Sequence, residues 1–267
     1  MLRGYVSRGT IFLALLFAGV TAFAASGVQT TTLTSGVSGG GGWPTSGRIV
    51  FEVLRGENGV KLGEARHVWK HDGVRYTMET AVETTGLAGM LYDFNYVQHS
   101  EGLVRADGLQ PIRFGVEQGG RAPEAASFDW KAGRVTIERR GRTREYPIRP
   151  MDQDALSVWH LIGVRNGRQP SVELTLVTGR VAAPATFEVI GHEAVRIPLG
   201  SIDALKVRVR ARSGKLVMDM WLSQAHDLLP VRVLMTDHKG EVLDQRAISF
   251  DRDAARGAVH KERNAQE

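Results

Sequence analysis

The fold is decided by the stretch Leu205-Lys206-Val207-Arg208-Val209-Arg210-Ala211-Arg212. Its odd positions are apolar and its even positions are cationic, which is the two-residue period of a β-strand with one buried face and one solvated face. A turn signal, Ser213-Gly214, follows this stretch. Residues 215–222 then resume the alternation, with Met218, Met220 and Leu222 on the core face and Asp219 facing out. These two segments therefore predict an antiparallel hairpin.

The same pattern extends outward along most of the chain. Segments of about five to ten residues are separated by turn signals that contain glycine, among them His71-Asp72-Gly73, Ala106-Asp107-Gly108, Lys131-Ala132-Gly133 and Arg140-Gly141. Regular short strands between glycine turns are typical of a meander that curls up. Residues 48–251 are therefore predicted to form a mainly β domain, a single antiparallel β-barrel or half-barrel meander of roughly a dozen strands.

One segment, Asp152 to Arg165, departs from this period. Leu156, Trp159, His160 and Ile162 recur at helical spacing, Asp152 is a good N-cap, and Asn166-Gly167 is a stop signal. This segment predicts one α-helix, at about residues 152–165, that packs on or in the barrel.

The N-terminus has the three-part layout of a secretory signal peptide. Arg3 and Arg8 precede an uncharged run, Ile11 to Phe23, which ends in Ala22-Phe23-Ala24. The run is shorter than the roughly 20 apolar residues of a membrane span. Residues 1–24 are therefore expected to be cleaved, which leaves no stable membrane span and places the protein in the periplasm. Residues 25–47 read as a Gly/Ser/Thr-rich flexible linker, and residues 252–267 as a charged, disordered tail.

Composition narrows the function classes. The chain has no cysteine, which excludes disulfides, thiol nucleophiles and acylation as a lipoprotein. The formal net charge of +5 falls to +3 when Arg3 and Arg8 leave with the leader, too little to indicate a nucleic-acid partner. No cofactor is predicted. His67 and His71 share one strand face but lie about 13 Å apart along it, too far to bind one metal ion.

Three sets of residues are candidate sites, and each has a purely structural alternative. Aromatic and methionine side chains either line a pocket for an apolar ligand or form plain core. The pocket candidates are Trp69, Tyr76, Phe94, Tyr96, Phe114, Trp159, Met218 and Trp221. Arginines around the turn at Gly141 form either an anion patch or a charged hairpin that keeps an edge strand soluble. These arginines are Arg139, Arg140, Arg142 and Arg144.

The third set, Asp152, Asp154 and His160, reads as an acid–base cluster. Alternatively, Asp152 and Asp154 lie in the first turn of the predicted helix, where capping and the helix dipole stabilise carboxylates. The capping interpretation needs no chemistry, so no catalytic residue and no metal ligand is assigned.

The order of several short motifs resembles a family of exported bacterial proteins known as domain of unknown function 3108. The motifs are Gly63-Glu64-Ala65, Ser100-Glu101-Gly102-Leu103, Leu109-Gln110-Pro111-Ile112-Arg113-Phe114, Asp152-Gln153-Asp154-Ala155-Leu156-Ser157 and Asp227-Leu228-Leu229-Pro230-Val231-Arg232, together with Gly86. The resemblance covers about Arg48 to Asp251 and implies an exported β-rich protein with no established activity. The Leu-Pro-Val-Arg ending, with Trp221 just before it, is also similar to periplasmic half-barrels that carry lipoproteins or lipids, at the level of fold only.

Three functions follow as hypotheses. The first is a non-enzymatic envelope protein that binds an apolar or amphiphilic ligand such as a lipid. The second is an interaction module for other envelope proteins, acting through a sheet edge or the arginine hairpin. The third is a hydrolase with a dispersed site at Asp152, Asp154 and His160.

Overall fold

The computed structural model describes residues 43–56, 59–84, 95–165, 167, 171–214, 216–237 and 239–251. These residues form one sheet of fifteen strands together with three short helical segments. The first eight strands are β1 (Ser46–Arg55), β2 (Val60–His71), β3 (Arg75–Thr84), β4 (Asn95–Arg105), β5 (Gly108–Gln118), β6 (Glu124–Asp129), β7 (Arg134–Arg139) and β8 (Arg142–Pro147). The remaining strands are β9 (Gln153–Asp154), β10 (Ser171–Val177), β11 (Ala182–Ile197), β12 (Gly200–Ala211), β13 (Leu216–Ser223), β14 (Leu229–Asp237) and β15 (Val242–Asp251).

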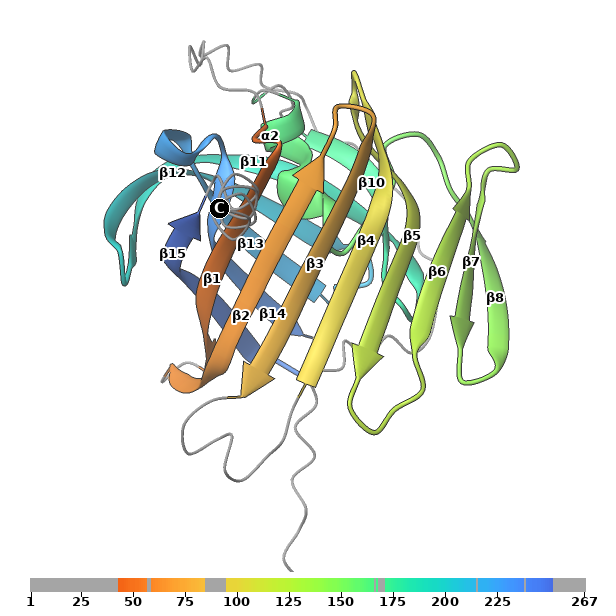
Figure 1. Cartoon of the computed structure of the whole chain (residues 1–267), viewed down its shortest axis with the longest axis horizontal. Coiled ribbons are helices and arrows are strands. Elements are labelled where there is room, and N and C mark those ends of the chain that lie inside the picture. The colour runs from red at the N-terminus through yellow and green to blue at the C-terminus, as the bar shows by residue number, and fades with distance from the viewer. Residues whose placement is uncertain are drawn as a thin grey trace, which may run out of the picture.

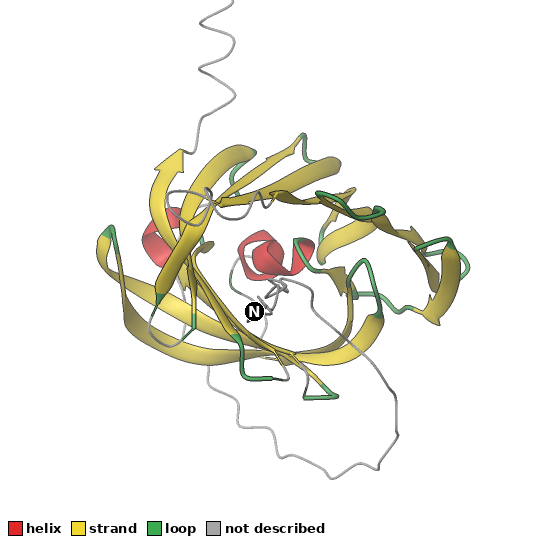
Figure 2. Ribbon diagram, turned by 90° about the horizontal axis from the view of Figure 1, so that it is seen from below, coloured by secondary structure: helices red, strands yellow, loops and turns green. Residues whose placement is uncertain are grey.

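The sheet is a meander that folds back on itself. Strands that follow one another in the chain pair with each other, except that β8 does not pair with β9. These two strands form the free edges of the sheet, and β1 pairs with β15. In Figure 1, β1 to β5 form the near layer and β13 and β14 lie behind them. Seen from the end in Figure 2, the strands curve around a central space that contains a helical segment. The predicted barrel-like meander is confirmed, as an open sheet of fifteen strands.

The hairpin predicted around Ser213-Gly214 is also confirmed. β12 pairs with β13, with Val207 opposite Met220 and Val209 opposite Met218, and all four side chains are buried. Asp219 alternates with these residues and so lies on the outer face as expected. It is nevertheless only 6% exposed, because the Arg208 guanidinium bonds both of its carboxylate oxygens, at 2.5 and 2.6 Å.

The predicted helix over residues 152–165 is much shorter than expected. The segment contains β9, the 3₁₀ helix η1 (Ser157–His160) and the α-helix α2 (Leu161–Val164). Asp152 is not a helix cap, because its carboxylate accepts the backbone N–H groups of Arg149 and Thr175. Asp154, two residues later, accepts the backbone N–H groups of Leu156 and Ser157 at the start of η1 instead. The apolar spacing was therefore a real sign of helix, but only its second half is helical.

The barrel begins earlier than residue 48. Residues 43–47 fall within the predicted linker, yet Trp43 is only 8% exposed and β1 starts at Ser46. The carbonyls of Pro44 and Thr45 accept hydrogen bonds from the Trp69 indole and the His71 backbone. The predicted signal peptide (1–24), the rest of the linker and the tail (252–267) lie outside the described residues. Within the described part of the chain, no helix is long and apolar enough to span a membrane.

Candidate functional site

A chain of buried hydrogen bonds links β2, β3 and η1 inside the barrel. The Trp43 indole N–H donates to Nδ1 of His160 at 2.9 Å. The Nε2 atoms of His160 and His67 lie 2.8 Å apart, and Nδ1 of His67 lies 2.7 Å from the Thr80 hydroxyl. Burial lowers the pKa of His67 to about 3 and places the pKa of His160 well below its usual value. Both imidazoles are therefore neutral at pH 7.

A second buried group of polar side chains surrounds Asp154. One carboxylate oxygen accepts the Ser100 hydroxyl at 2.6 Å, and the other accepts the backbone N–H groups of Leu156 and Ser157, both at 2.8 Å. The Tyr76 hydroxyl lies 3.2 Å from Ser100 Oγ. Burial raises the pKa of Asp154 to about 6, against the lowering effect of these hydrogen bonds.

The structure does not bring Asp152, Asp154 and His160 together as an acid–base cluster. Asp152 joins the 148–152 turn to β10, Asp154 binds Ser100, and His160 binds His67 and Trp43. Among the described residues, no hydrogen bond joins any two of these three side chains. General acid–base catalysis needs its groups within hydrogen-bond reach of one another and of a substrate, so this arrangement favours a structural role for the three residues.

An apolar cavity of about 100 Å³ opens at the end of the barrel where β1, β3 and β14 finish. Most of its wall is aliphatic or aromatic. The polar residues Thr80, Gln98 and Gln245 contribute to the wall as well, and Arg55, Asp237 and Glu241 complete it. The apolar part of the wall consists of Val53, Leu62, Val82, Tyr96, Ala155, Trp159, Met218, Met235, Val242 and Leu243.

Two polar atoms in residues of this wall are buried without a partner. Trp159 Nε1 and Gln245 Oε1 have no hydrogen-bond partner among the described residues. An unpaired buried donor or acceptor costs about 1–3 kcal/mol, and such groups are uncommon in folded proteins. Here a donor and an acceptor belong to two residues that line the same cavity.

The structure does not bring all the pocket candidates from the sequence analysis into one site. Tyr96, Trp159 and Met218 line the cavity. Trp69, Tyr76 and Phe114 are buried in the core but are not part of the cavity wall. Phe94 lies outside the described residues.

Trp221 is not a pocket residue, because it lies on the outer face of β13, out of phase with Met218 and Met220. Its ring packs between Lys206 and Arg232, and its indole N–H donates to Glu193 at 2.6 Å.

All four arginines of the predicted anion patch line one hollow. Arg139, Arg140, Arg142 and Arg144, with Ile137, form its wall, and the hollow has a volume of about 330 Å³. A fifth arginine, Arg180, joins them from the turn between β10 and β11. We call this hollow the arginine basin.

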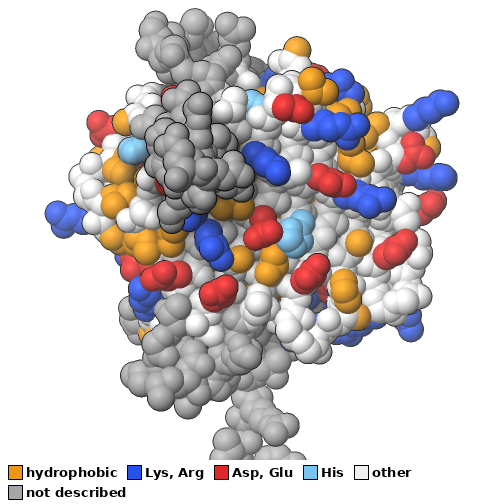
Figure 3. Space-filling view, in the orientation of Figure 1, with side chains coloured by type: hydrophobic (Ala, Val, Ile, Leu, Met, Phe, Trp, Pro, Cys, Tyr) orange, Lys and Arg blue, Asp and Glu red, His pale blue; other side chains and the backbone are white. Residues whose placement is uncertain are grey.

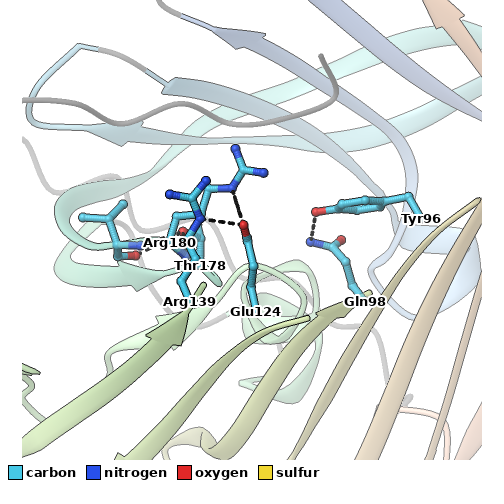
Figure 4. Close-up of polar contacts among 7 residues, drawn as sticks. Tyr96, Gln98, Glu124, Arg139, Thr178 and Arg180 are labelled. Atoms are coloured by element: carbon cyan, nitrogen blue, oxygen red, sulfur yellow. Dashed lines mark hydrogen bonds and ion pairs between the residues drawn. The ribbon is translucent and has the colours of Figure 1, made fainter. Parts of the chain in front are cut away.

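Glu124 on β6 organises the basin and connects distant parts of the sheet. Its carboxylate accepts Nε of Arg139 at 2.7 Å, and Nε of Arg180 lies 3.0 and 3.1 Å from its two oxygens (Figure 4). A Cβ on Gly179 would lie 2.8 Å from the Cβ of Glu124, so glycine allows the turn to approach this closely. These bonds tie β6, near one free edge of the sheet, to the end of β10, near the other.

Several of these residues carry no local sequence signal. Glu124 and Arg180 are 56 positions apart, and Gln245 stands in an ordinary strand. One signal was available for Trp43, since a tryptophan followed by proline is unusual in a Gly/Ser/Thr linker.

One solved structure supports this fold. The structure is similar to that of a β-barrel-like protein of domain of unknown function DUF1849 from Brucella abortus, with a TM-score of 0.53 and 13% identity, covering 78% of this chain and 98% of that chain. A lipoprotein candidate from Parabacteroides distasonis has a TM-score of only 0.32 and 11% identity, over 78% and 97% of the two chains. No curated protein matches.

The model of a protein family, described as "Protein of unknown function (DUF3108)", matches residues 50–245. This range runs from within β1 to within β15 and includes all residues that line the apolar cavity and the arginine basin. The chain belongs to the DUF3108 family.

Proposed function

We propose that this protein is a non-enzymatic binding protein of the bacterial envelope that takes the end of an apolar or amphiphilic molecule into the cavity beside Trp159. The observation that carries the proposal is the pairing of an apolar wall with an unpartnered donor, Trp159 Nε1, and an unpartnered acceptor, Gln245 Oε1. The predicted leader at residues 1–24 supports a location in the periplasm.

The size of the cavity limits the ligand. Sites for whole drug-sized molecules commonly measure about 300–1,000 Å³, and this cavity is about 100 Å³. It therefore accommodates one end of a chain, while the rest of the molecule extends past the mouth at Arg55 and Glu241.

The unpartnered atoms define the chemistry of the inserted part. A hydroxyl group is an acceptor, as the Trp159 N–H requires, and also a donor, as the Gln245 carbonyl requires. An aliphatic chain carrying a hydroxyl group meets both requirements, since its carbon atoms match the apolar wall. A pure alkane leaves both buried atoms unpaired.

The test is a binding titration with a matched pair of variants. Displacement of the fluorescent fatty acid cis-parinaric acid by decanol and by decane is measured for the wild type, Met235→Trp and Leu234→Trp. Met235 lines the cavity, and Leu234 is the adjacent residue on the opposite face of β14. The larger ring at position 235 is expected to weaken decanol binding by about tenfold or more, and the same change at position 234 to leave it unchanged.

Two further outcomes decide the proposal. Decanol is expected to bind more tightly than decane, and the difference is expected to shrink in Gln245→Leu, which removes the acceptor. If the wild type binds neither compound, or if both tryptophan variants bind as well as the wild type, the cavity is not the ligand site.

A further inference from the structure

The arginine basin lies on the inner face of the sheet, as the register of β7 and β8 shows. Ile137 stands opposite Arg144, and Arg139 stands opposite Arg142. Residues that face each other across an antiparallel pair project to the same side. Ile137 is a core residue, only 2% exposed, so Arg139, Arg142 and Arg144 project to the core side with it.

The outer face of the same hairpin carries both of its acids. Thr136 stands opposite Glu145, and Glu138 opposite Thr143, so both acids of the hairpin project away from the basin. On the face of the molecule shown in Figure 3, by contrast, acidic and basic side chains are interspersed. Both acids of the hairpin therefore lie on the outer face, where Glu145 is 3.8 Å from Arg134. The other strand arginines, Arg139, Arg142 and Arg144, gather on the inner face without either acid.

Five arginines line the basin, and one acid, Glu124, neutralises part of their charge. Glu124 binds Arg139 and Arg180, and among the described residues Arg140, Arg142 and Arg144 have no acidic partner. Like charges gathered in one hollow repel one another. The arrangement is therefore unfavourable by itself and becomes favourable when an anion enters.

Protection of the sheet edge does not explain this cluster. β8 is a free edge, and charged side chains on an edge strand prevent it from pairing with another chain. A positive or a negative side chain on either face of β8 would prevent such pairing equally well, so edge protection does not require five arginines in one hollow. It also gives no reason for Arg180, which comes from the turn between β10 and β11 and is held in the basin by Glu124.

The turn that carries Arg180 is itself rigidly built. The Thr178 hydroxyl accepts the backbone N–H groups of Arg180 and Val181, and the backbone N–H of Thr178 binds the Val181 carbonyl. The side chain of Arg180 is 11% exposed. Figure 4 shows Arg139 and Arg180 converging on Glu124 from two different segments. The guanidinium groups of Arg139 and Arg180 are thus oriented before any ligand arrives, which reduces the entropy cost of binding.

We propose that the arginine basin binds the phosphate group of an anionic ligand, through the guanidinium groups of Arg139, Arg140, Arg142, Arg144 and Arg180. A planar guanidinium presents paired N–H donors that match phosphate oxygens, and arginine remains charged at any physiological pH. The hollow of about 330 Å³ has room for a phosphate and part of the molecule that carries it. This site uses different residues from the apolar cavity and does not depend on the function proposed above.

The phosphate could come from a soluble compound or from a lipid headgroup, and the experiment separates these sources. Isothermal titration calorimetry at low salt is run with inorganic phosphate and with pyrophosphate. Vesicles of phosphatidylcholine, with and without phosphatidic acid, are tested by co-sedimentation. Binding of a soluble phosphate identifies a soluble ligand. Binding only to vesicles that contain phosphatidic acid identifies a headgroup, and either result supports the basin.

Two double variants test whether phosphate binding depends on the arginine basin or only on the overall charge of the protein. The double variant Arg142→Gln/Arg144→Gln removes two inner-face charges and is expected to weaken binding by about tenfold or more. The control Arg66→Gln/Arg134→Gln removes the same charge from exposed positions that do not line the basin, and is expected to change binding by less than about threefold. Equal weakening by both double variants, or no binding of any phosphate compound by the wild type, overturns the proposal. Thermal unfolding of each variant verifies that it is folded.

Discussion

The Nε2 atoms of His67 and His160 lie 2.8 Å apart in the interior of the barrel, and the neighbouring bonds determine where their protons are. Nδ1 of His160 accepts the Trp43 indole N–H, so in the neutral ring the proton of His160 is on Nε2. That N–H donates to Nε2 of His67, whose own proton is then on Nδ1 and faces the Thr80 hydroxyl. An additional proton on either ring would set two N–H groups against each other.

The first prediction concerns stability at acidic pH. The folded-state pKa values of His67 and His160 lie below the value of about 6.5 expected in the unfolded chain. Their contribution to stability is complete above pH 6.5 and is lost as the pH falls, because the unfolded chain takes up protons first. Below pH 6.5, each histidine is expected to lower the free energy of unfolding by about 1.4 kcal/mol for each unit that the pH falls. Urea unfolding at pH 7.0, 6.0 and 5.0 measures this slope.

The variant His160→Gln provides the corresponding check. It removes one of the two buried histidines. The free energy of unfolding is therefore expected to depend less steeply on pH between 6 and 5, by about 1.4 kcal/mol per pH unit, whatever the change in stability at pH 7. His99→Gln, at a half-exposed position on β4, is the matched control in which both buried histidines remain. An unchanged slope in His160→Gln would contradict the neutral histidine pair.

The second prediction concerns Asp154, whose pKa is raised to about 6. A raised carboxyl pKa contributes stability at low pH that is lost as the pH rises through 6, the opposite sign to the histidines. Asp154→Asn keeps the oxygen that accepts from Leu156 and Ser157 and removes the buried charge. We expect this variant to be at least as stable as the wild type at pH 7 and to lose about 1.4 kcal/mol more per pH unit between 6 and 4.

Asp154→Ala is the contrasting change at the same position. It leaves the backbone N–H groups of Leu156 and Ser157 unpaired, at a cost of about 2–4 kcal/mol at pH 7. The two variants are compared by urea unfolding. If they were equally destabilised, the charge of Asp154 rather than its hydrogen bonds would be the stabilising feature, against this interpretation.

The third prediction concerns the start of the domain. A chain that begins at residue 48 lacks Trp43, which stacks on His71 at 4.3 Å between ring centroids and donates to His160. It also lacks the Pro44 carbonyl that accepts the Trp69 indole N–H. We expect it to be less stable than a chain that begins at residue 43 by about 3–5 kcal/mol. Equal urea midpoints for the two chains would show that residues 43–47 behave as a linker after all.

Sequence reasoning succeeded where the information was local. The alternation in residues 205–212 and the turn at Ser213-Gly214 predicted β12 and its pairing with β13. The turn His71-Asp72-Gly73 was also correct, because Asp72 accepts the N–H groups of Val74 and Arg75, and Gly73 has a φ of 87°.

The errors came from contacts between distant segments. The helix was predicted too long because Gln153 and Asp154 pair with β10 instead of starting a helical turn. The four hairpin arginines were recognised as a candidate anion patch, but Arg180 and Glu124 were missed because neither is near them in the sequence. Trp221 was misplaced for a different reason: it is out of phase with Met218, and the strand period alone would have assigned it to the outer face.

The order of strands has a consequence for how the chain folds. Apart from the pairing of β1 with β15, every antiparallel pair in the sheet joins strands that are neighbours in sequence. Those hairpins close short loops, whereas the pairing of Arg48 with Asp251 joins residues 203 positions apart. Loop-closure entropy grows with length, and distant pairings slow folding. The two halves of the meander, β1 to β8 and β9 to β15, are therefore expected to form independently. The pairing of β1 with β15 is expected to be the late, rate-limiting step.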